Sequence, residues 1–174
     1  LPRLADEVYR RDPEIRFVAV GSGREFTTTE RLARELGVLD RSLFLLGKQS
    51  KADAAAWTTA ADITLALFTG PSVVWRDAVQ NKFFDSLAAG RPVANNFRGW
   101  QSIVAEEVGA GLILRPDDIP EAASSLVAAL RDEVWLLKAG RAARRLAEER
   151  FDRDILATQL EGVLKAALDG KHIQ

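Results

Sequence analysis

Short apolar runs alternate with helical patterns along the first two thirds of the chain. Each run has at most seven residues, too few for a buried helix, and Gly, Pro or Asp stands at one or both ends. Because almost every residue within them is apolar, the runs predict parallel strands that are covered on both faces. They are residues 15–21, 42–47, 62–68, 92–96 and 111–115.

Apolar residues at helical spacing fill the intervals between these runs and continue to the C-terminus. Gly37, Gly90 and Gly109 end three of the patterns, as expected of glycine after a last helical turn. This alternation predicts right-handed crossovers, and hence an α/β fold with an open, doubly wound parallel sheet and helices at the C-terminus. The predicted helices are 28–36, 51–60, 81–89, 100–108, 120–130, 133–149 and 152–168.

Length and composition fit a single domain, residues 1–174, or one half of a two-domain enzyme. Apolar residues make up 47%, enough for a core, and a net charge of −1 gives no field that would recruit nucleic acid. No apolar run approaches the roughly 18 residues of a membrane span. The chain starts at Leu1 and contains no methionine, so we expect it to be a fragment of a longer protein.

Two strand-to-helix loops contain glycine, and ligands of an open parallel sheet bind beyond the carboxyl ends of its strands. Gly21 and Gly23 follow the first run and let a ligand or another backbone approach closely, although a plain tight turn explains them equally well. Gly47 and Lys48 follow the second run. Lys48 is a candidate contact for an anion, with a capped turn as the alternative.

A third stretch has a helix start, Asn81–Lys82, between two acids, Asp77 and Asp85. The first N–H groups of a helix have no partner within it and lie at the positive end of its dipole, so this start predicts a phosphate site. Lys82 adds a point charge there. We expect Asp85 in the first turn, where an acid either complements the dipole or accepts two hydrogen bonds from vicinal ribose hydroxyls.

Other chemistry has little support in the sequence. The absence of cysteine excludes disulfides, thiolate metal sites and cysteine nucleophiles. No cluster of acids and histidines has metal-ligand spacing, and the one histidine is His172, so we expect neither a metal nor a cofactor. The four tryptophans are expected to pack in the core or at the edge of the domain rather than to stack on a base, with Trp75 and Trp100 as the exceptions to watch because they flank the proposed site.

An ordered set of four segments carries a resemblance to a known family. These are residues 21–23 (GSG), 36–68, 77–96 and 106–118. The set resembles the C-terminal, nucleotide-binding half of a GT-B glycosyltransferase, which has a Rossmann-like fold. More narrowly, it is similar to family 4 of the retaining enzymes, the glycosyl transferases group 1. That family has two glutamates separated by seven residues, then small residues and Gly-x-Pro-Val; this chain has Asp77 and Asp85, then Leu-Ala-Ala-Gly-Arg-Pro-Val.

The resemblance implies a role for each residue around the helix start. Asp85 would bind the ribose hydroxyls of the donor nucleotide, and the backbone at Asn81 and Lys82 would hold its diphosphate. Asp77 would lie near the transferred sugar, in the position of the catalytic acid. Both acids are one methylene shorter than the family's glutamates, which leaves the role of Asp77 open.

The glycine loops receive roles from the same resemblance. Gly47 and Lys48 would meet the base, and Gly21 and Gly23 would line the donor crevice. The family also places an Arg and a Lys on a first strand and loop that would precede Leu1, together with a whole acceptor-binding domain. We therefore expect this chain to bind a nucleotide weakly and to be inactive by itself.

The resemblance implies that the full enzyme transfers a hexose from a nucleotide diphosphate sugar to a carbohydrate or lipid-linked acceptor. UDP-sugar is the first expected donor and GDP-sugar the second, in bacterial surface polysaccharide synthesis. The expected location is cytoplasmic, with peripheral association at the inner face of the membrane. The last predicted helix has an apolar stripe whose partial exposure would offer a dimer contact. The stripe is Ile155, Leu156, Leu160, Val163, Leu164 and Ala167.

Three other classes remain as alternatives. A nucleotide-sugar 2-epimerase shares the architecture but depends on histidines, and His172 is the only one here. A doubly wound regulatory domain needs an acidic cluster after its first strand, where this chain has Gly21 and Gly23. A dinucleotide-binding domain needs a third glycine in that loop and an acid about twenty residues further on.

Overall fold

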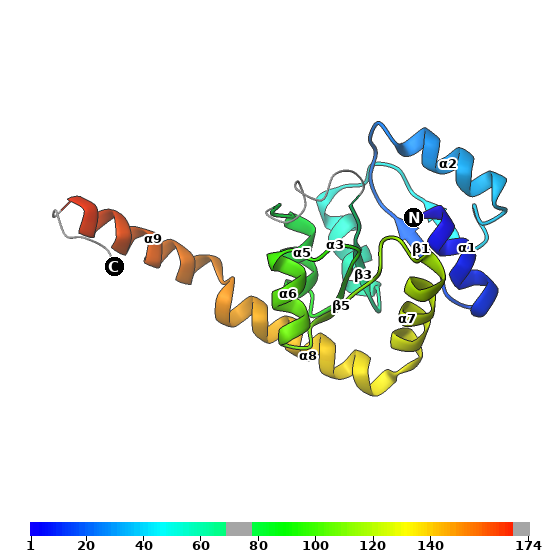
Figure 1. Cartoon of the computed structure of the whole chain (residues 1–174). Coiled ribbons are helices and arrows are strands. Elements are labelled where there is room, and N and C mark those ends of the chain that lie inside the picture. Colours follow the sequence, from blue (N-terminus) through cyan, green and yellow to red (C-terminus); the bar gives the residue numbers. More distant parts are fainter. Residues whose placement is uncertain (69–77, 169–174) are drawn as a thin grey trace.

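The computed structural model describes residues 1–68 and 78–168 (Figure 1). Its strands form two parallel sheets, each strand inside one of the predicted runs. The first sheet pairs β1 (Phe17–Ala19) with β2 (Leu43–Leu45), and the second has the order β3 (Thr64–Ala66), β4 (Val93–Asn95), β5 (Gly111–Ile113). The α/β prediction with parallel strands is confirmed, although the described strands pair in two sheets rather than one.

The described helices match the predicted ones to within two residues at each end, with one addition at the N-terminus. Ser50 caps α3, because its Oγ accepts the N–H of Asp53 at 3.1 Å. The bounds are α1 (Pro2–Arg11), α2 (Phe26–Glu35), α3 (Lys51–Ala60), α5 (Asn81–Ala88), α6 (Trp100–Glu107), α7 (Ile119–Arg131), α8 (Glu133–Arg150) and α9 (Arg153–Leu168).

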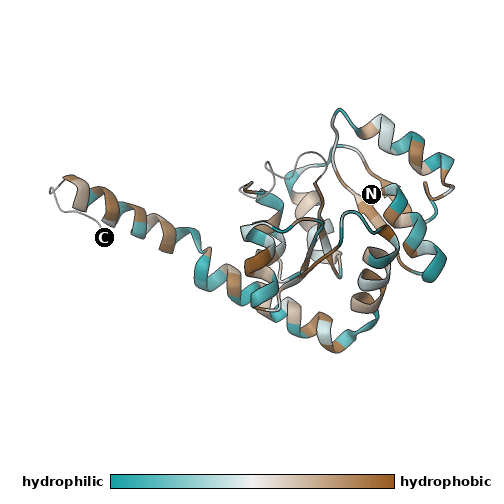
Figure 2. Ribbon diagram, viewed as in Figure 1, coloured by the Kyte–Doolittle hydropathy of each residue, from teal (hydrophilic) through white to brown (hydrophobic). Residues whose placement is uncertain are grey.

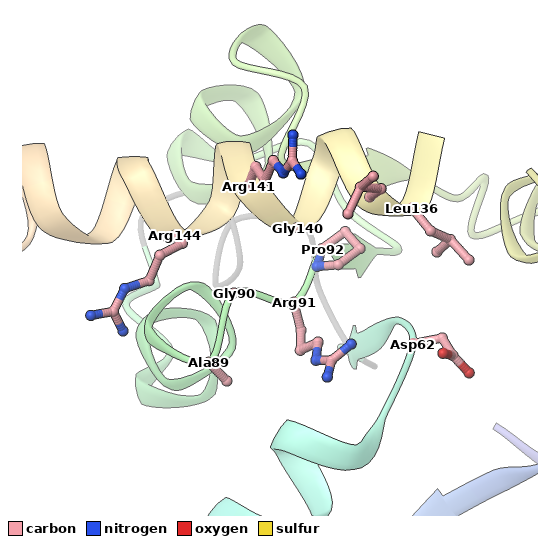
Figure 3. A pocket seen from close by; sticks show the side chains of 10 residues that line it. Asp62, Ala89, Gly90, Arg91, Pro92, Leu136, Gly140, Arg141 and Arg144 are labelled. Atoms are coloured by element: carbon pink, nitrogen blue, oxygen red, sulfur yellow. The ribbon is translucent and has the colours of Figure 1, made fainter. Parts of the chain in front are cut away.

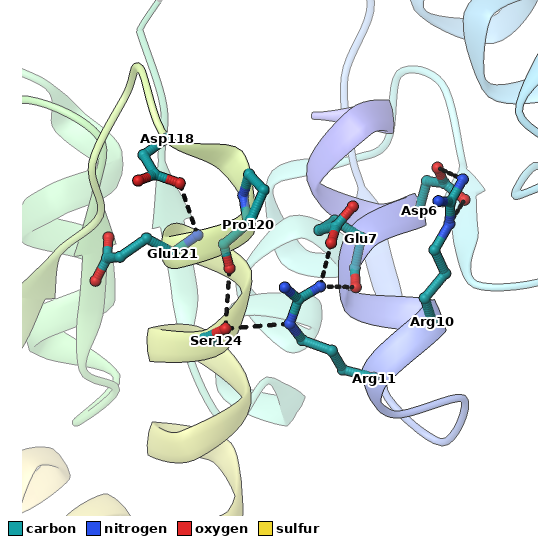
Figure 4. Close-up of polar contacts among 8 residues, drawn as sticks. All are labelled: Asp6, Glu7, Arg10, Arg11, Asp118, Pro120, Glu121 and Ser124. Atoms are coloured by element: carbon teal, nitrogen blue, oxygen red, sulfur yellow. Dashed lines mark hydrogen bonds and ion pairs between the residues drawn. The ribbon is translucent and has the colours of Figure 1, made fainter.

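Helix α1 is the element that the sequence analysis missed. Leu4, Ala5 and Val8 lie at helical spacing and are buried in the core that α7 also lines. A polar contact joins the two helices as well, since Arg11 Nε donates to Ser124 Oγ of α7 at 3.1 Å (Figure 4). The start of α7 is capped by Asp118, as its position before the helix predicts.

Helices cover both faces of the three-stranded sheet. Leu65 and Ala94 belong to the core formed with α1 and α7, whereas Ala66 and Val93 belong to the core formed with α5, α6 and α8. Because neighbouring residues in a strand point to opposite faces, this alternation places one core on each side of the sheet. The doubly wound prediction is therefore confirmed.

Two glycines permit close backbone approaches in the core on the α5 and α8 side. A Cβ on Gly111 of β5 would lie 2.2 Å from the carbonyl oxygen of Val93 in β4. A Cβ on Gly140 of α8 would lie 2.7 Å from the carbonyl oxygen of Gly90, which follows α5 at φ +66°. The positions of β5 and α8 thus depend on the absence of these two side chains.

Helix α9 extends away from the rest of the domain (Figure 1), and none of its residues is buried. Aromatic rings hold the preceding end of α8, where Phe151 lies 5.1 Å from Phe84 and 6.2 Å from Trp100, centroid to centroid. The predicted apolar stripe is exposed along α9 (Figure 2), with Leu160 59% and Leu164 56% exposed. Trp100 thus packs among aromatic rings, and Trp57 lies at the surface with 42% of its area exposed.

Candidate functional site

The start of α5 is the best-defined candidate for an anion site in the described part of the chain. Gln80 is the N-cap residue, with extended backbone and no side-chain cap hydrogen bond. Asn81 is therefore the first helical residue rather than the cap. As the first two residues of the helix, Asn81 and Lys82 have no carbonyl one turn earlier for their N–H groups. These groups lie at the positive end of the helix dipole.

Lys82 brings an uncompensated charge to this helix start. Its side chain is exposed overall, yet partial loss of hydration around the ammonium group lowers its pKa below the ordinary value of 10.5. No ion pair with Lys82 is formed by the residues whose positions are described. An anion bound beside the ammonium group would offset that loss of hydration.

Asp85 lies one helical turn beyond Asn81, in the second turn of α5 rather than in the first. The prediction of a first-turn position was wrong because Asp85 is the fifth residue of a helix that begins at Asn81, as predicted, and the first turn ends before it. The dipole effect falls off within the first turn, so it does not explain this acid. The carboxylate is exposed and has no ion pair or hydrogen bond to any described side chain. Its acceptor oxygens are available to a ligand.

The interior face of α5 contains one polar residue. Phe83, Ser86 and Leu87 are buried and Phe84 is half-buried. Ala88 is exposed, although it is apolar, and Ser86 occupies the interior because its Oγ donates to the Lys82 carbonyl at 2.6 Å. This bond satisfies a hydroxyl that would otherwise be costly to bury.

The two glycine loops meet at the carboxyl ends of β1 and β2. The N–H of Gly21 donates to the carbonyl of Gly47 at 2.7 Å, and both glycines have positive φ, +142° and +64°. No atom lies within 4 Å of a Cβ placed on Gly21, Gly23 or Gly47, so the space above the loops is open. Lys48 beside them is exposed. The two loops thus lie side by side, and Lys48 places a positive charge beside them.

The structure brings the candidate residues together in two groups. One is Gly21, Gly23, Gly47 and Lys48, and the other is Asn81, Lys82 and Asp85. No hydrogen bond or ion pair between described residues joins the two groups. Both groups follow the carboxyl ends of parallel strands, the edge at which open sheets bind ligands. Asp77 and Trp75 lie outside the described residues.

Amide side chains that the sequence analysis did not single out hold the backbone near this edge. Asn96 accepts the N–H of Phe68 at 2.7 Å and donates to its carbonyl at 2.8 Å. Gln101 binds Gln80 in the same way, accepting its N–H at 3.1 Å and donating to its carbonyl at 3.3 Å. The side-chain amides of Gln80 and Asn95 are buried and unpaired among the described residues. Nothing in the local sequence pattern distinguishes these amides from ordinary surface ones.

A hollow of about 470 Å³ lies at the opposite end of α5 (Figure 3). Its arginines, Arg91, Arg141 and Arg144, point in three different directions in this view. Arg144 donates to the carbonyl of Ala88 and pairs with Glu148 at 2.7 Å. Cations at the carbonyl end of a helix complement its dipole, so this hollow has a structural explanation and contains none of the candidate residues.

Neither a metal cluster nor a membrane span is found in the described ranges. No group of three or more acids and histidines there could hold a metal ion. None of the described helices is long and apolar enough to cross a membrane.

Comparison with solved structures shows the fold. The chain is similar to Anabaena HepE in complex with UDP (TM-score 0.79, 20% identity, 94% of this chain and 44% of that one). It is also similar to sucrose-phosphate synthase from Thermosynechococcus elongatus (TM-score 0.80, 18% identity, 98% and 43%). The C-terminal domain of the glycosyl transferase group 1 protein LpcC from Francisella tularensis matches with a TM-score of 0.69 and 15% identity over 87% of this chain and 77% of that domain.

The chain spans less than half the length of HepE and of sucrose-phosphate synthase. No curated protein matches the sequence. The family model for glycosyl transferases group 1 matches residues 1–132, which include both glycine loops and α5. The chain therefore belongs to the glycosyl transferases group 1 family and has the Rossmann-like fold of the C-terminal half of a GT-B glycosyltransferase.

Proposed function

We propose that this chain is the donor-binding part of a retaining glycosyltransferase that moves a hexose from a nucleotide diphosphate sugar. The observation that carries the proposal is the start of α5, where free N–H groups, an unpaired ammonium and an unpaired carboxylate lie within two helical turns. Such an N-terminus favours a diphosphate. A carboxylate one turn further along can accept hydrogen bonds from ribose hydroxyls.

Each candidate residue has a place in this proposal. The backbone of Asn81 and Lys82 holds the diphosphate, with the Lys82 ammonium adding charge, and Asp85 binds the ribose. Gly47 and Lys48 lie near the base, and the open loop at Gly21 and Gly23 borders the donor. We assign the catalytic acid to Asp77 on the family motif alone.

We further propose UDP-sugar as the first donor and GDP-sugar as the second. The HepE structures contain UDP, UDP with glucose, and UDP-glucose, which supports the first choice. The acceptor is a carbohydrate or lipid-linked glycan, bound by another domain of the full protein. WaaG, a solved relative at 20% identity, acts in lipopolysaccharide biosynthesis, which supports a role in bacterial surface polysaccharide synthesis.

The whole of residues 1–174 is proposed to form a single donor-binding domain that is inactive alone. The match to an isolated C-terminal domain, that of LpcC, supports this division.

Peripheral association of the full protein with the cytoplasmic face of the membrane belongs to the same proposal. So does a dimer through α9, whose exposed stripe gives it an apolar surface. A monomeric mass by light scattering would contradict the dimer.

Ligand-observed NMR with UDP, GDP, ADP and NAD tests the donor assignment. We expect UDP to bind in preference to the others with a millimolar dissociation constant, about 4 kcal/mol of binding free energy. NMR detects binding of that strength. A preference for NAD would contradict the proposal, and a preference for GDP would reverse the order of donors.

The affinity for UDP should fall as the pH rises through the lowered pKa of Lys82. Below that pKa the ammonium attracts the diphosphate, and above it the charge is lost; the fall should therefore begin below 10.5, the ordinary value for lysine. Titration by NMR between neutral and alkaline pH measures it. The control is Lys82→Arg, which stays charged throughout. Deprotonation of the uracil ring of UDP would change the affinity of both proteins alike. Identical pH profiles for the unmodified chain and Lys82→Arg would therefore exclude a role for Lys82.

A further inference from the structure

Gln101 holds the residue from which α5 starts. Its amide accepts the backbone N–H of Gln80 at 3.1 Å and donates to the backbone carbonyl of Gln80 at 3.3 Å. Both backbone polar groups of the N-cap residue are thereby bound by one side chain. Gln101 is only 1% exposed, so the pair is shielded from competing water.

This pair of hydrogen bonds, the Gln80–Gln101 clamp, is made by α6, whose start is itself held by several contacts. Gln101 lies in the first turn of α6, where Ser102 Oγ accepts the N–H of Gly99 at 2.9 Å. Trp100, the neighbour of Gln101, lies 6.1 Å from the ring of Phe83 in α5, centroid to centroid, and 6.2 Å from that of Phe84. The starts of α5 and α6 are therefore fixed to each other by two kinds of contact.

The orientation of the Gln80 peptide determines where α5 points its first N–H groups. The Gln80 carbonyl also accepts the N–H of Phe83 at 3.1 Å, so the clamp and the first helical hydrogen bond share one acceptor. Rotation of the Gln80–Asn81 peptide would redirect the N–H of Asn81, and a shift of the helix start that followed from it would redirect that of Lys82. Hydrogen-bond donors that act on an anion must be held in place before the ligand arrives.

A second observation at the same residue indicates a ligand. The Gln80 side chain is 8% exposed, and both polar atoms of its amide are buried without a partner in the described structure. Buried unpaired amides are rare in folded proteins, and each needs an explanation such as strain, a catalytic role, or a bound water or ion. This one belongs to the N-cap of the helix whose start carries the free N–H groups.

We propose that Gln101 is a positioning residue, which fixes the Gln80 peptide so that the N–H groups of Asn81 and Lys82 are directed at a diphosphate. This inference rests on the proposed function of α5 and adds a residue from a different helix to it. Gln101 acts through the backbone of Gln80 and touches no substrate itself. The chemical class of the ligand is a diphosphate ester, with inorganic pyrophosphate as the simplest member.

The test compares Gln101→Met with the unmodified chain. Methionine matches the volume of glutamine and removes both hydrogen bonds. We expect the variant to bind UDP and inorganic pyrophosphate at least about tenfold more weakly, a loss of about 1.4 kcal/mol. Binding of uridine, which has no diphosphate, should be unchanged. Backbone amide shifts of Asn81 and Lys82 in labelled protein report whether the helix start has moved.

A purely structural role would give a different pattern. Leu126→Ala is the matched control, because Leu126 is 1% exposed in α7 within the core on the other face of the sheet. It should lower the free energy of unfolding without changing pyrophosphate binding, and both variants are compared at temperatures where they remain folded.

Equal pyrophosphate binding by Gln101→Met and the unmodified chain would overturn the inference. Binding of pyrophosphate but not UDP by the unmodified chain would overturn the proposed function while still testing Gln101. Binding of neither would overturn both.

Discussion

Gly111→Ala should lower the free energy of unfolding by about 3 kcal/mol or more, at the upper end of the cost of overpacking a core. Gly111 is the first residue of β5 and lies directly opposite Val93 in the parallel pair. A Cβ there would be 2.2 Å from the Val93 carbonyl oxygen and 3.2 Å from its Cγ1. Val93 is fully buried, so its backbone cannot move without displacing β4 from the packed core.

An opposing effect acts on the unfolded chain but is smaller. Alanine restricts the unfolded state relative to glycine, which on its own stabilises a protein by about 0.4–1 kcal/mol. The clash with a backbone atom in a sheet outweighs this gain, because no side-chain rotation can relieve it. The net change is therefore destabilising.

Denaturant unfolding monitored by circular dichroism measures the change, with Gly162→Ala as the control. Gly162 lies within α9, and no atom is found within 4 Å of a Cβ placed on it. Alanine there should leave the free energy of unfolding unchanged or raise it by up to about 1 kcal/mol through helix propensity. A Gly111→Ala protein as stable as the unmodified chain would mean that β4 and β5 do not approach as closely as described.

Much of the fold could be predicted because the local pattern and the tertiary structure agree. Each described strand lies inside a largely apolar run bounded by a residue that disfavours continuation, and α3 begins directly after its N-cap Ser50. Helix α1 was missed although Leu4, Ala5 and Val8 have helical spacing, because its polar residues outnumber the apolar ones. It is stable through burial against α7, which only the tertiary structure reveals.

The candidate site was predictable only where it is local in sequence. Asn81, Lys82 and Asp85 fall on one short helix, and their order along the chain determines their order on its surface. The clamp between Gln80 and Gln101 joins residues 21 positions apart, and it exists because α5 and α6 start side by side at the same edge of the sheet. No periodicity predicts such a pair. The split of the strands into two sheets likewise depends on long-range pairing.

Asp85→Ala should weaken UDP binding by roughly ten- to a hundredfold, because hydrogen bonds to a charged group contribute about 1.5–3 kcal/mol. Stability should change little, since the Asp85 carboxylate is exposed and makes no hydrogen bond or ion pair with a described side chain. The loss should therefore be specific to the ligand.

Comparison of UDP with 2′-deoxy-UDP identifies the group that Asp85 contacts. If the carboxylate accepts hydrogen bonds from the ribose, the unmodified chain should prefer UDP, and the Asp85→Ala chain should bind both nucleotides equally. This double comparison isolates the pairwise interaction from any general loss of affinity. Asp117→Ala, at another exposed acid, is the control and should retain the preference for UDP. A preference for UDP that survives in Asp85→Ala would assign the ribose contact to another residue. In that case the free N–H groups and Lys82 would remain as a diphosphate site without the ribose-binding acid expected from the family motif.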